Sequence, residues 1–107
     1  MLSNEEITKL ETKIVETLKT VFDPEIPVNI YELGLIYEVI VSDEGKVEIK
    51  MTLTSPNCPM VDSLLQEIHD KVKPLEGVTD FMLNIVFDPP WNKNMMSDAA
   101  LLDLGLI

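Results

Sequence analysis

The fold of this chain is decided by residues 35–54, which read LIYEVIVSDEGKVEIKMTLT. Apolar side chains alternate with polar ones in both arms, a period that is typical of strands with one covered face. The apolar positions are Tyr37, Val39, Val41, Val47, Ile49, Met51 and Leu53. The positions expected on a wet face are Glu48, Lys50, Thr52 and Thr54. Residues 42–45, Ser-Asp-Glu-Gly, have turn chemistry, so the stretch predicts an antiparallel β-hairpin.

Amphipathic helices are predicted on both sides of this hairpin. Over residues 3–22, apolar residues recur every three or four positions, and Ser3 with Glu6 forms a capping box. The Asp-Pro pair at 23–24 ends this helix, because the residue before a proline disfavours helical geometry. A second apolar stripe of the same period predicts a helix over residues 59–73.

Residues 78–87 alternate like the hairpin and predict a third strand. The connection from the second strand is long enough for a parallel β-α-β unit. Ser97 is the expected N-cap of a short C-terminal helix. The order α-β-β-α-β with a helical tail predicts an α+β two-layer sandwich, with two helices on one face of a three-stranded mixed sheet. A chain of 107 residues has room for one such domain, residues 1–107.

The net charge of −11 comes from eight lysines, no arginine and nineteen acidic residues, and it excludes some functions. Nucleic-acid binding requires a cationic surface, so neither DNA nor RNA is an expected partner. No apolar run approaches the roughly 20 residues of a membrane span. The acidic N-terminal segment is unlike a signal peptide. We therefore expect a cytoplasmic protein without nucleic-acid or membrane partners.

Cys58 is the only cysteine and lies in a loop with Thr54, Asn57 and Pro59, between a predicted strand and a predicted helix. The start of a helix stabilises a thiolate, so a reactive thiol and a buried apolar side chain both stay open as interpretations. One thiol cannot supply the four ligands of a zinc site or a cluster. The only histidine, His69, lies roughly 16 Å further along the helix, too far to activate the thiol, and is expected on the surface.

Two further segments are candidate functional regions. The loop over residues 22–34 is long, stiff and acidic, and Asp23 and Glu25 are its candidate site acids, although both also suit a solvated turn. After the third strand comes Phe-Asp-Pro-Pro-Trp at 87–91. We expect Trp91 to pack over the sheet edge or the tail, and docking of a partner on Trp91 is the alternative.

Three segments in this order resemble the signatures of a known family. They are DPEIPVNIYELGLIY at 23–37, MTLTSPNCPM at 51–60, and DPPW at 88–91 followed by Met-Ser at 96–97 and LGL at 104–106. The family is that of the SufT/PaaD-like metal–sulfur cluster biosynthesis proteins, which includes the cytosolic targeting factor of eukaryotic iron–sulfur assembly. The resemblance covers nearly the whole chain, and the family fold is the sandwich predicted above.

This resemblance implies a non-enzymatic accessory role in assembling iron–sulfur clusters or transferring them to apo-proteins. The family's functional cysteine falls on Cys58 and its signature acid on Asp23. The implied partners are iron–sulfur scaffold or carrier proteins and apo-protein clients. No cofactor is expected to be stably bound. A transient iron–sulfur cluster would take Cys58 as a metal ligand shared between the two chains of a homodimer.

Three alternatives remain at this stage. The protein is a non-enzymatic adaptor with a structural cysteine, a maturation subunit of a ring-hydroxylating, phenylacetate-type oxygenase system, or a thiol enzyme. The thiol enzyme is disfavoured because no base lies within reach of Cys58. The extra metal-ligating cysteines of the PaaD-like branch are absent, which favours a SufT-like general factor. At the position of the family's tail arginine this chain has Leu101.

Overall fold

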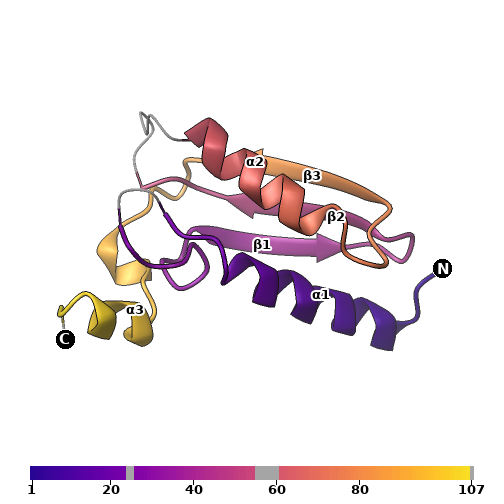
Figure 1. Cartoon of the computed structure of the whole chain (residues 1–107), viewed down its shortest axis with the longest axis horizontal. Coiled ribbons are helices and arrows are strands. Elements are labelled where there is room, and N and C mark those ends of the chain that lie inside the picture. The colour runs from indigo at the N-terminus through magenta and orange to yellow at the C-terminus, as the bar shows by residue number, and fades with distance from the viewer. Residues whose placement is uncertain (24–25, 55–60, 107) are drawn as a thin grey trace.

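The computed structural model describes residues 1–23, 26–54 and 61–106, and the elements follow the predicted order (Figure 1). The elements are α1 (Asn4–Leu18), β1 (Ile36–Val41), β2 (Lys46–Met51), α2 (Val61–Val72), β3 (Asp80–Ile85), the 3-10 turn η1 (Lys93–Met95) and α3 (Asp98–Asp103). Within these described ranges, no helix has the length and apolar character that crossing a membrane requires.

The three strands form one mixed sheet in the order β1-β2-β3. Strands β1 and β2 are the antiparallel hairpin, with Val39 opposite Ile49. Strand β3 runs parallel to β2, with Leu83 opposite Ile49. Figure 1 shows α1 and α2 lying over the same face of this sheet. The predicted α+β sandwich with a mixed three-stranded sheet is therefore confirmed.

Helix α1 begins where the sequence predicts and ends earlier. The Ser3 hydroxyl accepts from the Glu6 N–H at 3.1 Å, and the Glu6 carboxylate accepts from the Ser3 N–H at 3.0 Å, which lowers the pKa of Glu6. The helix ends at Leu18 rather than at residue 22. There the chain tightens into a turn in which the Val21 N–H donates to the Leu18 carbonyl at 3.1 Å. This turn places Val21 in the core. Burial of Val21 therefore takes precedence over the apolar periodicity, which predicted a helix up to residue 22.

The core lies between the two helices and the sheet. Its fully or nearly fully buried members from these elements are Leu10, Ile14 and Leu18 of α1, Val47, Ile49 and Met51 of β2, and Leu64, Ile68 and Val72 of α2. Each such side chain stabilises the fold by about 1.5–3 kcal/mol relative to an exposed position. Strand β2 is central in the sheet, so its inward side chains are covered on all sides.

Two details of the hairpin differ from regular alternation. A register shift between Ile36 and Glu38 makes an irregularity at Tyr37. The prediction that Thr52 lies on a wet face is wrong, because its side chain is 1% exposed. The backbone pairing of the hairpin continues past the end of β2, where the Thr52 N–H donates to the Leu35 carbonyl at 2.9 Å. Segments that lie far apart in the sequence therefore enclose this end of the sheet.

The C-terminal segment packs back onto the domain. Ser97 caps α3, as predicted, and its hydroxyl accepts from the Ala100 N–H at 3.1 Å. The Ser97 N–H donates to the Glu32 carbonyl at 2.8 Å. Ala100 is buried, and Leu101 packs against the same core. An apolar side chain at position 101 therefore contributes to tail packing.

Candidate functional site

Three connecting segments meet where β2 and β3 end, and we call this region the loop end (Figure 1). They are the segment between α1 and β1, the segment that follows β2 and the segment that follows β3. The Val86 N–H donates to the Met51 carbonyl at 2.8 Å, so β3 is held to the end of β2. The Trp91 indole N–H donates to the Leu33 carbonyl at 2.7 Å, which joins the last segment to the first.

Asp23 is buried in the segment between α1 and β1, with 6% of its surface exposed. Its carboxylate oxygen Oδ1 accepts from the Ile26 N–H at 2.9 Å, and its own N–H donates to the Val28 carbonyl at 3.2 Å. The predicted helix end implied that Asp23 lies against the helix C-terminus. Because α1 ends at Leu18, Asp23 lies beyond the last helical turn. The carboxylate therefore stabilises the backbone of its own loop.

The described part of this loop is anchored rather than solvated. Phe22 and Asn29 form an isolated antiparallel bridge, and the Asn29 side chain accepts from the Glu32 N–H at 2.9 Å. Ile30 and Leu33 are fully buried. The loop is therefore held rigidly at both ends by backbone pairing and by apolar burial.

The predicted cysteine loop lies mostly outside the described residues. Asn57, Cys58 and Pro59 fall there, and so does Glu25 of the acidic loop. Thr54 is described and lies directly before the cysteine loop. Its hydroxyl and that of Thr52 are buried, and neither has a hydrogen-bond partner in the described part of the chain. Each unpaired buried hydroxyl costs about 1–3 kcal/mol.

Trp91 fastens the segment after β3 to the loop before β1. Its ring is partly buried against the core, and its indole N–H is used in the bond to Leu33. Nearby in the chain, the Pro89 carbonyl accepts from the Tyr37 hydroxyl at 2.7 Å. Trp91 therefore packs within the domain and is bonded to the loop before β1, while its packing over the sheet edge or the tail and the docking of a partner on it stay predictions.

Gly34 is a structural residue that sequence reasoning missed. Its φ is +81°, and a side-chain carbon on it would lie 2.2 Å from the Met95 carbonyl oxygen. The backbone of the loop before β1 therefore touches the backbone of η1 directly. The only local signal is a glycine in a turn, which does not reveal that Met95 is its neighbour.

The described titratable groups near the loop end do not by themselves form a metal centre. Within the described ranges, no group of three or more histidine, cysteine, aspartate or glutamate side chains is placed to hold a metal ion. His69 is on the surface, as predicted, with Nδ1 3.5 Å from the Asp70 carboxylate and the ring 5.8 Å from that of Phe81.

Comparisons with known proteins agree on one family. Residues 11–80 match the family described as iron–sulfur cluster assembly protein. A Porphyromonas gingivalis protein named Fe–S protein maturation auxiliary factor is 48% identical over 104 residues, which cover 97% of this chain and 99% of that protein. A Staphylococcus aureus protein named Fe–S protein maturation auxiliary factor SufT is 42% identical over 86 residues, covering 80% and 98% of the two chains. The crystal structure of a domain of unknown function, DUF59, from Bacillus anthracis superposes with a TM-score of 0.89 at 32% identity, covering 98% and 100%.

Proposed function

Because the chain belongs to the family of iron–sulfur cluster assembly proteins, we propose that it is an accessory factor in assembling iron–sulfur clusters or transferring them to apo-proteins. The observation that carries this proposal is the 48% identity, over nearly the full length of both chains, to a protein named as a maturation factor. The partners proposed are an iron–sulfur scaffold or carrier protein and apo-protein clients in the cytoplasm. The protein acts by contact and delivery, without catalysis.

Cys58 is the residue proposed to contact the cluster, as a transient ligand. It is the only thiol of the chain, and clusters are held by cysteine thiolates. Since one chain supplies one such ligand, a cluster bound to this protein needs a second Cys58 from a dimer and further thiols from outside. The cluster is therefore cargo that passes to a client, and no cofactor stays bound.

The hydrogen bonds that hold the described segments of the loop end support this role. Asp23 holds its own loop through Ile26, and Trp91 and Tyr37 hold the segment after β3 by bonds of 2.7 Å. A transient ligand needs a defined position, because a misplaced thiol does not complete the coordination of iron. Asp23 and Trp91 thus serve as positioning residues, and their proposed contribution is to the shape of the loop end.

The proposal is tested by complementation in cells that lack this protein, with the activity of an iron–sulfur enzyme as readout. Cys58→Ala is expected to abolish rescue while the purified variant keeps its melting temperature. Ser63→Ala, an exposed change in α2, is the matched control and is expected to rescue fully. Full rescue by folded Cys58→Ala would instead make the protein an adaptor with a structural cysteine.

Anaerobic reconstitution provides a second test that does not depend on cells. We expect the isolated monomer to bind no stoichiometric zinc and no intact cluster. Any bound cluster is expected to elute with a dimer and to require added thiol. A stable four-iron cluster on a monomer without added thiol would contradict the proposed ligand set.

A further inference from the structure

Strand β3 is an edge strand with an open side. It pairs only with β2 among the described segments, since the sheet order is β1-β2-β3. In a parallel pair of strands, the backbone N–H and C=O of one residue point to the same side of its strand, and the side alternates from residue to residue. The Val86 N–H donates to the Met51 carbonyl, so the even-numbered residues face β2. The backbone N–H and C=O groups of Phe81, Leu83 and Ile85 therefore point to the open side, where Asp80 Oδ1 already accepts from the Phe81 N–H at 2.9 Å.

Beyond Asp80, whose carboxylate accepts from the Phe81 N–H, the described residues of this edge carry none of the features that normally protect an exposed strand. Native edges are usually blocked by charges, prolines, bulges or a covering segment. Residues 81–85 read Phe-Met-Leu-Asn-Ile, without a charge or a proline, and their pairing with β2 is regular. The strand therefore presents a template on which another strand can pair.

An apolar groove lies beside this edge, between β3 and α2. Its volume is about 450 Å³, and it is lined by Asp62, Leu65, Gln66, His69, Phe81 and Leu83. Phe81 and Leu83 contribute their side chains to the groove, and the Phe81 C=O and both peptide groups of Leu83 contribute to the edge. A strand that pairs with β3 thus places every second side chain into the groove, since side chains alternate along a strand.

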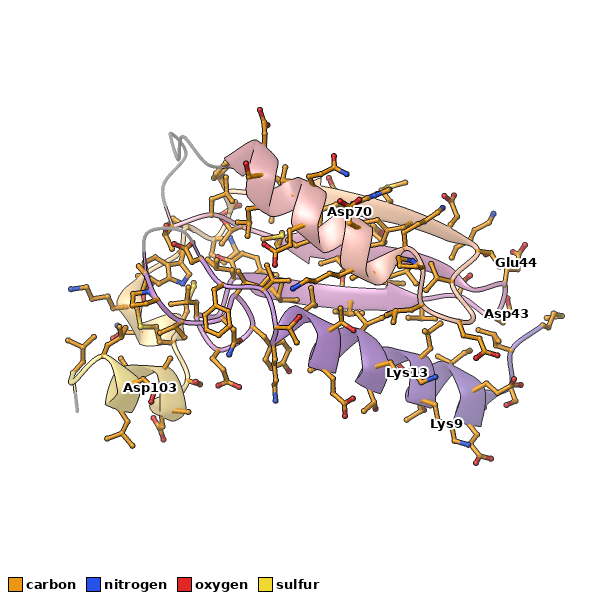
Figure 2. The ribbon with its side chains drawn as sticks, in the orientation of Figure 1. Lys9, Lys13, Asp43, Glu44, Asp70 and Asp103 are labelled. Carbon is orange, nitrogen blue, oxygen red and sulfur yellow. The ribbon has the colours of Figure 1, made fainter. Side chains whose placement is uncertain are left out.

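The charges around the groove indicate which partner fits. Asp62 lines the groove at the start of α2, and no described residue forms an ion pair with it. Asp70 lies further along α2 (Figure 2), and Asp80 begins β3 with Lys73 3.8 Å away. A second copy would bring another net charge of −11, whereas a basic segment would be attracted.

We propose that the β3 edge binds an extended, basic segment of a partner protein as a fourth strand. Main-chain hydrogen bonds to the Phe81 C=O and to the N–H and C=O groups of Leu83 and Ile85 provide affinity, and alternate apolar side chains of the partner fill the groove. The partner's intervening lysine or arginine side chains lie on the opposite face of the sheet, where the net charge of −11 attracts them, and one that flanks the apolar positions reaches Asp62 at the end of the groove. This inference rests on β3 and α2 alone and does not depend on a role for Cys58.

The test is a titration of the isotope-labelled protein with two synthetic peptides at low salt, followed by nuclear magnetic resonance. The alternating peptide Lys-Val-Lys-Ile-Lys-Val-Lys is expected to shift the backbone amides of Leu83 and Ile85 and to slow their hydrogen exchange. The block peptide Lys-Lys-Lys-Lys-Val-Val-Ile has the same composition and is expected to bind at least about tenfold more weakly, because it cannot alternate.

Variants of the protein distinguish binding at the β3 edge from attraction of the peptide by the overall negative charge. Leu83→Lys places a charge in the groove and is expected to weaken binding of the alternating peptide at least about tenfold. If Leu83→Lys does not fold, Asp62→Asn replaces it, because this change leaves the apolar groove intact. It is expected to weaken binding of the alternating peptide by a smaller factor. Ile40→Lys, on the far strand β1, is the matched control and is expected to bind as the unchanged protein does.

Several results would overturn the proposal. Equal binding of the two peptides would mean general electrostatic attraction, and shifts that map to β1 would mean another surface. Protection of the β3 amides by self-association without peptide would make a second copy the occupant. Absence of any shift at about 1 mM alternating peptide would mean that no strand binds there, since weaker binding is worth less than about 4 kcal/mol.

Discussion

The backbone of Gly34 lies directly against that of Met95, and Gly34→Ala tests what this close approach contributes to stability. A side-chain carbon at Gly34 would lie 2.2 Å from the Met95 carbonyl oxygen, where real contacts exceed 3.0 Å. The φ of +81° adds strain for any residue with a side chain. The strain costs about 1–2 kcal/mol and the overlap with packed backbone about 1–3 kcal/mol. We therefore expect Gly34→Ala to lower the free energy of unfolding by about 2–5 kcal/mol.

Gly77→Ala is the matched control because it isolates the backbone strain. Its φ is +99°, but the added carbon would meet only the Leu10 side chain, at an ordinary distance of 3.4 Å. We expect this variant to lose about 1–2 kcal/mol. Since each kcal/mol shifts the melting temperature of a domain near this size by about 4–8 °C, thermal melts resolve the difference between the two variants.

Tryptophan fluorescence shows where the damage occurs. Trp91 is the only tryptophan and donates to Leu33, one residue before Gly34. If the Met95 backbone must move away, Trp91 loses its partly buried position. Gly34→Ala is therefore expected to shift native-state emission to the red, and Gly77→Ala is expected to leave it unchanged. Equal melting temperatures and equal emission for the two variants would refute the reasoning.

Three further outcomes are expected from the same contacts. Asp23→Ala is expected to destabilise the protein by about 1–3 kcal/mol in thermal melts, because the partly buried Ile26 N–H loses its acceptor. Asp23→Asn is expected to destabilise it less, because the amide oxygen still accepts, and equal melting temperatures for the unchanged protein and both variants would exclude a structural role of the carboxylate. Thr52→Val is expected to raise stability by about 1 kcal/mol in denaturant titrations, because the buried hydroxyl is unpaired in the described structure, and a loss would indicate a partner in the cysteine loop. The hydrogen bond from the Ser3 N–H lowers the pKa of Glu6. The stability that the ionised Glu6 contributes to the folded protein is therefore fully present above the ordinary glutamate pKa of about 4.3, and it is lost as the pH falls through the lowered pKa. Glu6→Gln is therefore expected to reduce the dependence of the free energy of unfolding on pH in that range. An unchanged pH dependence would contradict a stabilising role of the ionised Glu6 at the start of α1.

Features that depend on neighbours in sequence were predictable from the chain alone. The hairpin at 35–54 follows from its period of two, and the start of α1 follows from the capping box of Ser3 and Glu6, which the structure contains. Ser97 caps the last helix for the same reason. These signals are local because a cap joins residues three positions apart and a strand alternates between adjacent ones.

The candidate site was only partly predictable. Its segments were identified, because proline-rich loops and a lone cysteine stand out in sequence. Cys58 lies outside the described residues, so its role remains a prediction. The burial of Asp23 and Thr52 was missed, since a pattern of polar residues predicts exposure unless another segment covers them.

Only the tertiary structure decided what covers the loop end. The bond from Trp91 to Leu33 spans 58 positions, and the bond from Tyr37 to Pro89 spans 52. No local period or cap encodes such a pairing, because it arises when the helices and sheet bring distant segments to one end of the molecule. The sequence by itself determined the elements and their order. The contacts that bury Thr52, stop α1 at Leu18 and require a glycine at position 34 come from packing across that distance.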